Sequence, residues 1–115
     1  MYELDHVALQ TQDVAASARY YVENFGAQIL YQDATWAFLQ LGQGKLALVT
    51  PSQHPAHVAL RVSREELETF AARVEIPIDK HRDGTIGIYI NDPNGHAVEL
   101  ICYPPEETAY DADNS

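Results

Sequence analysis

The sequence predicts an α+β fold built from two βαβββ modules, and three observations lead to this prediction. The tetrapeptide His-Val-Ala-Leu occurs at residues 6–9 and again at residues 57–60, an offset of 51 in a chain of 115 residues. Each copy lies in a stretch of strand-forming residues that precedes a helix N-cap signal. Three further stretches that favour strands follow each predicted helix. The repeat indicates two copies of one structural unit within a single domain over residues 1–105.

The first module is predicted over about residues 4–51. Residues 4–10 alternate in polarity, as a half-buried strand does. Asp13 is the expected N-cap of a helix over residues 14–24, and Gly26 is its expected C-terminal stop. Three strands complete the module, with the turn Gly42-Gln43-Gly44 before the last of them, at residues 27–31, 35–41 and 45–50.

The second module is predicted over about residues 55–103. It begins with a strand at residues 56–62, and Ser63 with Glu66 forms a capping box for a helix that ends near Val74. A short, irregular strand is expected at residues 76–80. The turn Asp92-Pro93-Asn94-Gly95 joins the last two strands, at residues 86–91 and 97–103. Residues 106–115 are polar and acidic, and we expect them to form a disordered tail.

Three side chains of this pattern predict a metal site: His6, His57 and Glu99. The repeat places the two histidines at equivalent positions, and strand alternation sends both to the face opposite the helices. Glu99 lies in the otherwise apolar strand Ala97-Val98-Glu99-Leu100-Ile101, and the same offset relates it to Leu48. Two imidazoles and one carboxylate leave open coordination positions. One divalent ion, Fe, Mn, Ni or Zn, is therefore expected.

Further residues on the same faces are candidates for contact with a substrate. Tyr89 alternates with three isoleucines and is predicted to point toward Glu99, either as a packed core residue or as a catalytic hydroxyl. His54, His81 and His96 are interpreted as loop residues. The predicted substrate-binding residues, whose simpler interpretation is packing or a structural ion pair, are Trp36, Phe38, Gln40, Leu48, Arg61 and Tyr103.

The composition of the chain limits the classes of partner and the cellular location that we expect. Seventeen acidic and seven basic residues give a net charge of −10, which opposes binding to nucleic acid or to an anionic membrane. The single cysteine, Cys102, excludes an internal disulfide. The segment Met1-Tyr2-Glu3-Leu4-Asp5 lacks the features of a signal peptide. We therefore expect a cytoplasmic protein that binds a small molecule.

These segments resemble the vicinal oxygen chelate superfamily, which comprises glyoxalases, bleomycin-resistance proteins and dioxygenases. The resemblance is carried by residues 5–9, by Asp13 through Tyr20-Tyr21 to Phe25-Gly26, and by residues 57–60 and 88–100. It implies that the paired modules form a cupped mixed sheet around a divalent metal. It also implies a homodimer, in which His6 of one chain meets His57 and Glu99 of the other.

The resemblance further implies an enzyme that binds two neighbouring substrate oxygens to the metal. Leu48 stands where glyoxalase I enzymes have a fourth ligand, which disfavours a lactoylglutathione lyase or a methylmalonyl-CoA epimerase. The His-His-Glu set is similar to extradiol dioxygenases and to fosfomycin-resistance thiol transferases, and Tyr89 matches a substrate-contacting tyrosine of the latter. Asp83 and Gly87 replace phosphonate-binding residues. The expected activity is dioxygenase-like or glyoxalase/thiol-transferase-like. The alternative is a non-catalytic sequestration protein of the bleomycin-resistance type.

Overall fold

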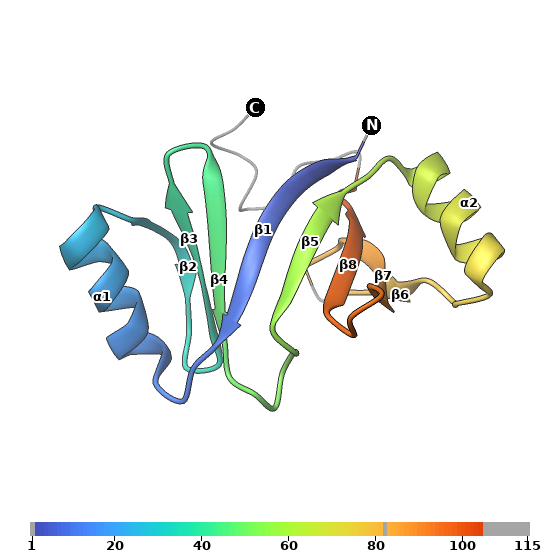
Figure 1. Ribbon diagram of the computed structural model, residues 1–115. Coiled ribbons are helices and arrows are strands. Elements are labelled where there is room, and N and C mark those ends of the chain that lie inside the picture. The colour runs from blue at the N-terminus through green and yellow to red at the C-terminus, as the bar shows by residue number, and fades with distance from the viewer. Residues whose placement is uncertain (1, 82, 105–115) are drawn as a thin grey trace. The chain divides into compact units, whose positions relative to one another are not determined.

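The computed structural model describes residues 2–81 and 83–104, so the tail predicted at residues 106–115 lies outside the described residues (Figure 1). The chain divides into two compact units. The amino-terminal unit covers Asp5–Val58. The carboxy-terminal unit covers the described residues from Ala59 onward, together with those that precede Asp5. Among residues 2–81 and 83–104, no helix has the length and apolar character needed to cross a membrane.

The amino-terminal unit contains most of one strand, a helix and a three-stranded meander. In chain order these elements are β1 (Glu3–Gln10), α1 (Val14–Phe25), β2 (Gln28–Gln32), β3 (Trp36–Leu41) and β4 (Gly44–Val49). Their order in the sheet is β2-β3-β4-β1, with β1 parallel to β4 and the other pairs antiparallel.

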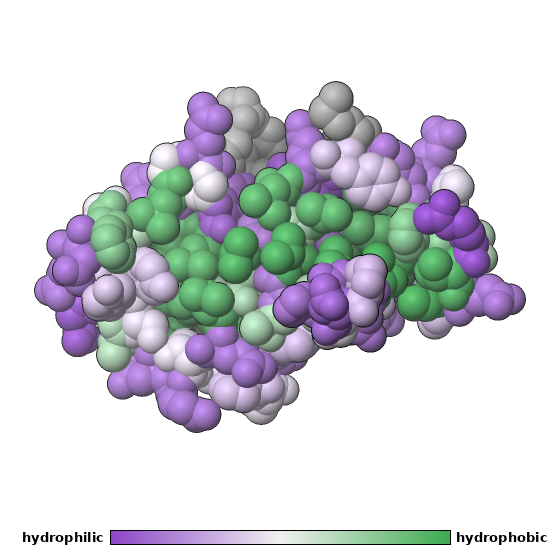
Figure 2. All heavy atoms as spheres, viewed as in Figure 1, coloured by the Kyte–Doolittle hydropathy of each residue, from purple (hydrophilic) through white to green (hydrophobic). Residues whose placement is uncertain are grey.

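Helix α1 begins and ends as the sequence predicts. The Asp13 carboxylate accepts a hydrogen bond from the backbone N–H of Ala16 at 3.0 Å, and Gly26 adopts the left-handed conformation with φ of 72°. Figure 2 shows hydrophilic side chains along the outer side of this helix and hydrophobic ones toward the sheet. The buried side is continuous with a core of aliphatic residues from α1, from the connection between α1 and β2, and from β3 and β4, namely Val14, Ala18, Ala27, Ala37, Leu39, Leu46 and Leu48.

The carboxy-terminal unit repeats this plan. Its elements are β5 (His57–Arg61), which starts in the amino-terminal unit, α2 (Arg64–Val74), β6 (Asp79–Lys80), β7 (Ile86–Asn91) and β8 (Ala97–Cys102). The sheet order is β5-β8-β7-β6, and β7 is antiparallel to both of its neighbours. The predicted capping box is present, because Ser63 and Glu66 exchange side-chain hydrogen bonds with each other's backbone N–H. The core consists of Val62, Leu67, Ala71, Ile88, Leu100 and Cys102.

The strand predicted at residues 76–80 is shorter than expected. Helix α2 ends at Val74, and its C-cap residue Glu75 adopts the left-handed conformation with φ of 58°. The N–H of Ile76 then donates to the carbonyl of Ala71 at 3.1 Å, so this residue closes the helix end. Only Asp79 and Lys80 pair with β7. The predicted α+β fold with a βαβββ order in each half is confirmed.

A single carboxylate organises the connection between β2 and β3. Asp33 accepts hydrogen bonds from the Tyr31 hydroxyl at 2.6 Å and from the backbone N–H groups of Thr35 and Trp36 at 2.8 and 2.9 Å. These donors, the Tyr31 hydroxyl first among them, hold the pKa of Asp33 well below its usual range. The ionised carboxylate therefore fixes the turn that leads into β3.

We predict that Asp33→Asn lowers the free energy of unfolding by about 1 to 2 kcal/mol at neutral pH, because the amide accepts these hydrogen bonds less strongly. The folded-state pKa lies below the unfolded value, so the stabilisation is complete above about pH 5 and is lost as pH falls below about 4. Urea unfolding from pH 7 to pH 3 should show a flatter acid dependence for Asp33→Asn than for the wild type. Asp79→Asn, in the exposed strand β6, is the control and should keep the wild-type pH profile. The same wild-type profile in Asp33→Asn would contradict the proposed role of Asp33.

Candidate metal centre

His6 and His57 lie together in the amino-terminal unit. Both residues are buried, at 8% and 7% exposure. Their ring centroids are 5.5 Å apart, and one ligand nitrogen of each lies within 4.8 Å of the other. Two bonds of about 2.1 Å to a common ion keep ligand atoms within about 4.2 Å of each other. A small adjustment therefore suffices for both rings to share one ion.

Hydrogen bonds to the Nδ1 atoms determine how the two rings are protonated. His6 Nδ1 lies 2.7 Å from the Asp5 carboxylate, and His57 Nδ1 lies 2.7 Å from the carbonyl oxygen of Pro55. Ionised carboxylates and carbonyls only accept hydrogen bonds, so both Nδ1 atoms carry the proton. In the neutral rings the lone pairs are therefore on Nε2. This is the arrangement in which a second partner orients a metal-binding histidine.

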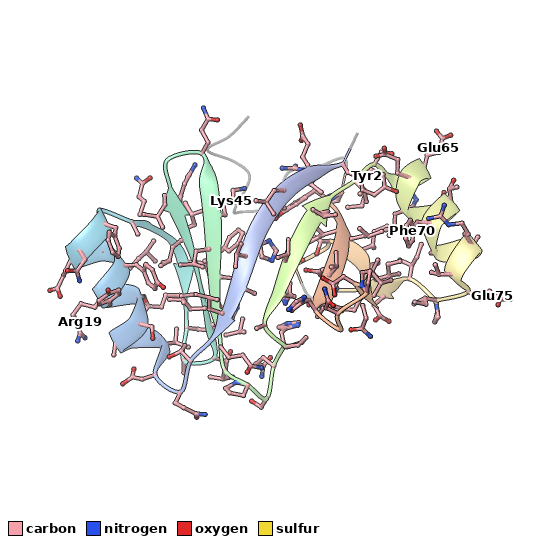
Figure 3. All side chains as sticks on the ribbon, in the orientation of Figure 1. Tyr2, Arg19, Lys45, Glu65, Phe70 and Glu75 are labelled. Atoms are coloured by element: carbon pink, nitrogen blue, oxygen red, sulfur yellow. The ribbon has the colours of Figure 1, made fainter. Side chains whose placement is uncertain are left out.

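Aromatic side chains of β3 lie beside His6. The Phe38 ring meets the His6 ring edge-on at 5.4 Å between centroids, and Trp36 lies 5.9 Å from Phe38. Lys45 of β4, labelled in Figure 3, places its ammonium group 5.7 Å from the Phe38 centroid. Gln40 donates to the Gly42 carbonyl at 3.1 Å, so it lies at the hairpin end of the strand. The side chains beside His6 are thus the aromatic rings of Phe38 and Trp36, and the Lys45 ammonium group lies next to Phe38.

Glu99 is the buried carboxylate of the carboxy-terminal unit, at 3% exposure on β8. It is the register partner of Tyr89 on β7, as their alternation predicts. Burial, with a smaller contribution from the Glu99 charge, raises the pKa of Tyr89 well above its ordinary value. Tyr89 is therefore a hydroxyl donor at neutral pH. His81 Nε2 lies 3.6 Å from Glu99 Oε2.

Arg61 and Tyr103 form a stacked pair in the same unit, with the guanidinium carbon 4.0 Å from the ring centroid. This contact favours the structural interpretation of Arg61, since the cation lies against an aromatic face. Cys102 is buried among aliphatic residues, and burial raises the pKa of its thiol. A thiol in that environment is a poor nucleophile.

The prediction that Leu48 belongs to the site is wrong, because Leu48 packs in the core beneath α1. The register of β4 with β1 explains the error. Leu48 pairs with Leu9, whereas Ala47 pairs with Ala8 and so shares the face of His6. The offset of 51 holds for the histidine strands but gives the wrong face of β4, because a shift by one residue reverses the side of the sheet.

Some residues of the site were missed by the sequence analysis. The position of Asp5 directly before the first repeat was a sequence signal that could have identified it. Its contact with His6, however, is visible only in the folded structure. Pro55 acts through its carbonyl oxygen, which every residue has, and no sequence pattern identifies it. Lys45 and His81 contact site residues only because strand register and a loop bring them there. His96 binds Asp92 within the exposed turn, in agreement with its interpretation as a loop residue.

Fold and sequence together define the class of protein. Residues 3–100 match the model of the Glyoxalase/Bleomycin resistance protein/Dioxygenase superfamily, so the chain belongs to this family. It is 29% identical over 112 residues to metallothiol transferase FosB of Staphylococcus haemolyticus (strain JCSC1435), covering 84% of this chain and 81% of the relative. FosB of Staphylococcus epidermidis matches with the same identity and coverage.

Solved structures confirm the fold. The hypothetical protein BH1468 from Bacillus halodurans C-125 matches with a TM-score of 0.73 at 16% identity, over 91% of this chain and 96% of that chain. Methylmalonyl-CoA epimerase from Mycobacterium tuberculosis matches with a TM-score of 0.72 at 16% identity, over 90% of this chain and 89% of that chain. At this identity the likeness concerns the fold alone.

We predict that Leu48→Ala lowers the free energy of unfolding by about 2 to 5 kcal/mol, because it leaves a cavity beneath α1. Leu9→Ala is the matched control: Leu9 pairs with Leu48 but is 39% exposed, so its loss should be much smaller. Chemical denaturation of both variants measures the difference. Equal, small losses would show that Leu48 is not a core residue. Leu48→Glu should likewise destabilise the protein and leave its metal affinity unchanged.

Proposed function

We propose that this chain is a divalent-metal-dependent enzyme that binds a small substrate through two neighbouring oxygen atoms. His6, His57 and Glu99 would hold the metal. The observation that carries the proposal is that two buried histidines lie side by side, each with its Nδ1 atom 2.7 Å from an oxygen acceptor. Since the Asp5 carboxylate and the Pro55 carbonyl accept from Nδ1, the lone pair of each neutral ring would be on Nε2, and one ligand nitrogen of each ring lies within 4.8 Å of the other.

Glu99 fits as the third ligand for reasons of charge and burial. A carboxylate at 3% exposure is costly unless a cation or several donors compensate it. Two neutral imidazoles and one carboxylate make a common ligand set for Fe(II), Mn, Ni or Zn, and they leave positions open for a substrate. Each of the three residues is buried and offers one ligand atom. The family to which the chain belongs supports the same assignment.

When bound, the metal would act as a Lewis acid for a substrate oxygen. The side chains around it have separate tasks in the proposal. Tyr89 keeps its proton at neutral pH and would donate a hydrogen bond to the substrate. Phe38 and Trp36 would exclude water on the side of His6, and Lys45 would attract an anionic group.

The similarity to metallothiol transferases favours transfer of a thiol to the substrate, and a dioxygenase-like reaction is the second candidate because it uses the same ligand set. The proposal also includes the homodimer that the resemblance implies and the cytoplasmic location that the sequence analysis expects. It differs from the implied site in one respect: His6 lies beside His57 of the same chain, so these two ligands do not require a second chain.

We predict that the purified protein binds one divalent ion per chain and that His57→Ala and Glu99→Ala lose most of it. Asp5→Asn should keep the ligands but weaken binding by about 10- to 100-fold, because an amide oxygen is a weaker acceptor for the Nδ1 proton of His6 than a carboxylate. Elemental analysis after dialysis against buffered metal measures this. His96→Ala, which removes an exposed turn histidine, is the control and should retain the ion.

Full metal content in both His57→Ala and Glu99→Ala would contradict the ligand assignment. A wild-type protein that stays metal-free after reconstitution would contradict the enzyme proposal. Binding of a small organic ligand by that metal-free protein would favour sequestration instead.

A further inference from the structure

The turn between β7 and β8 contains a pair of residues with a covalent reactivity of its own. Asn94 is followed directly by Gly95, both residues are exposed, and no other asparagine of the sequence precedes a glycine. Asparagine is among the chemically labile residues of proteins. The backbone nitrogen of the next residue can attack its side-chain carbonyl carbon, and glycine hinders this approach least because it has no side chain.

The space around this pair is open. A Cβ atom added at Gly95 would meet nothing within 4 Å. In the described part of the chain, no hydrogen bond holds the side-chain amide of Asn94, whereas the amide of Asn24 donates to the Tyr20 carbonyl at 2.9 Å. The Asn94 side chain can therefore rotate toward the nitrogen of Gly95.

Asp92 holds the backbone of the turn in place. Its Oδ1 atom accepts hydrogen bonds from the backbone N–H groups of Asn94 and His96, each at 2.9 Å. Its carbonyl oxygen accepts from the N–H of Gly95 at 3.0 Å. The bond from the His96 backbone, first among several, holds the pKa of Asp92 below its usual range, so the carboxylate is ionised at neutral pH.

These hydrogen bonds oppose the attack on Asn94. The Gly95 nitrogen must leave the Asp92 carbonyl and lose its proton before it can bond to the side-chain carbon. The Asn94 backbone must also turn, although its own N–H is held by the Asp92 carboxylate. The reaction is therefore confined to the fraction of molecules in which the turn is open, and that fraction is set by the free energy of local opening.

We propose that Asn94 is a site of spontaneous deamidation whose rate is limited by the hydrogen bonds of Asp92. The Gly95 nitrogen bonds to Cγ of Asn94, and the bond from Cγ to the side-chain nitrogen breaks. The proton of the Gly95 nitrogen passes through water to the leaving group, which departs as ammonia. Water then opens the cyclic imide at either of its carbonyls and leaves aspartate or isoaspartate. Water is the only co-reactant, and nothing is oxidised or reduced.

The product would change the turn in two ways. It carries a new carboxylate next to that of Asp92, and like charges repel each other. In isoaspartate the main chain also runs through Cβ and is longer, so the N–H and carbonyl groups of the turn cannot all keep their partners. The turn joins the strands on which Tyr89 and Glu99 are register partners. The inference itself does not depend on the proposed function.

The test follows the full chain during incubation at neutral pH, with peptide mapping by mass spectrometry to locate each amide that becomes a carboxylate. We expect conversion at Asn94 and none at Asn24. Asp92→Ala should convert Asn94 about tenfold faster than the wild type, which is the effect of losing one hydrogen bond to a charged group. Asp92→Asn should be intermediate, and its introduced amide precedes Pro93, which has no N–H. Asp79→Ala, in the exposed strand β6, is the matched control and should keep the wild-type rate.

The wild-type chain unfolded in urea gives the rate of the unrestrained pair, and near-ultraviolet circular dichroism shows whether each variant is folded. Faster conversion of Asn94 in urea than in the folded wild type would support the inference even if Asp92→Ala did not fold. Equal rates in the folded wild type and in folded Asp92→Ala would overturn the role of Asp92. An Asn94 that stays unmodified in urea, or that converts no faster than Asn24 there, would overturn the site itself.

Discussion

The hydrogen bonds to the Nδ1 atoms of His6 and His57 are the constraint on which the site depends. An imidazole that is free to rotate and to exchange its proton between two nitrogens is a poor starting point for a metal ligand. Here the Asp5 carboxylate accepts a hydrogen bond from His6 Nδ1 and the Pro55 carbonyl accepts one from His57 Nδ1, each over 2.7 Å between the heavy atoms. These hydrogen bonds hold each ring in one orientation and, when the ring is neutral, in one tautomer. Less of the binding free energy of the ion is therefore lost in ordering the two imidazole rings.

The strands supply the positions that these hydrogen bonds refine. In β1 and β5 the repeated tetrapeptide begins with histidine, and strand alternation puts its valine and leucine on the other side from the imidazole. In β8 the same rule separates Glu99 from Leu100, which packs in the core of the carboxy-terminal unit. One alternating sequence thus encodes both a packed face and the face that carries the proposed metal ligands. Substitutions on the packed face should change stability, and those on the other face should change binding.

Much of the fold could be predicted from the sequence, because the signals are local. Asp13, Gly26 and the Ser63–Glu66 capping box act within one helical turn, and the structure confirms each of them. Leu48 was assigned to the wrong face, since the prediction carried one numerical offset across strands whose register is set by their partners. The prediction of His81 as a loop residue is confirmed, but its contact with Glu99 depends on the pairing of β7 with β8 and was beyond local reasoning.

The proposed function requires that His6, His57 and Glu99 hold one divalent ion. X-ray absorption spectroscopy of the Zn²⁺-loaded protein is the measurement that tests this ligand set, because the scattering from imidazole rings gives the number of histidine ligands. We expect two imidazoles, with oxygen atoms in the other positions at about 2.0 to 2.2 Å and no sulfur. A first shell with fewer than two imidazoles, or with a sulfur atom from Cys102, would contradict it.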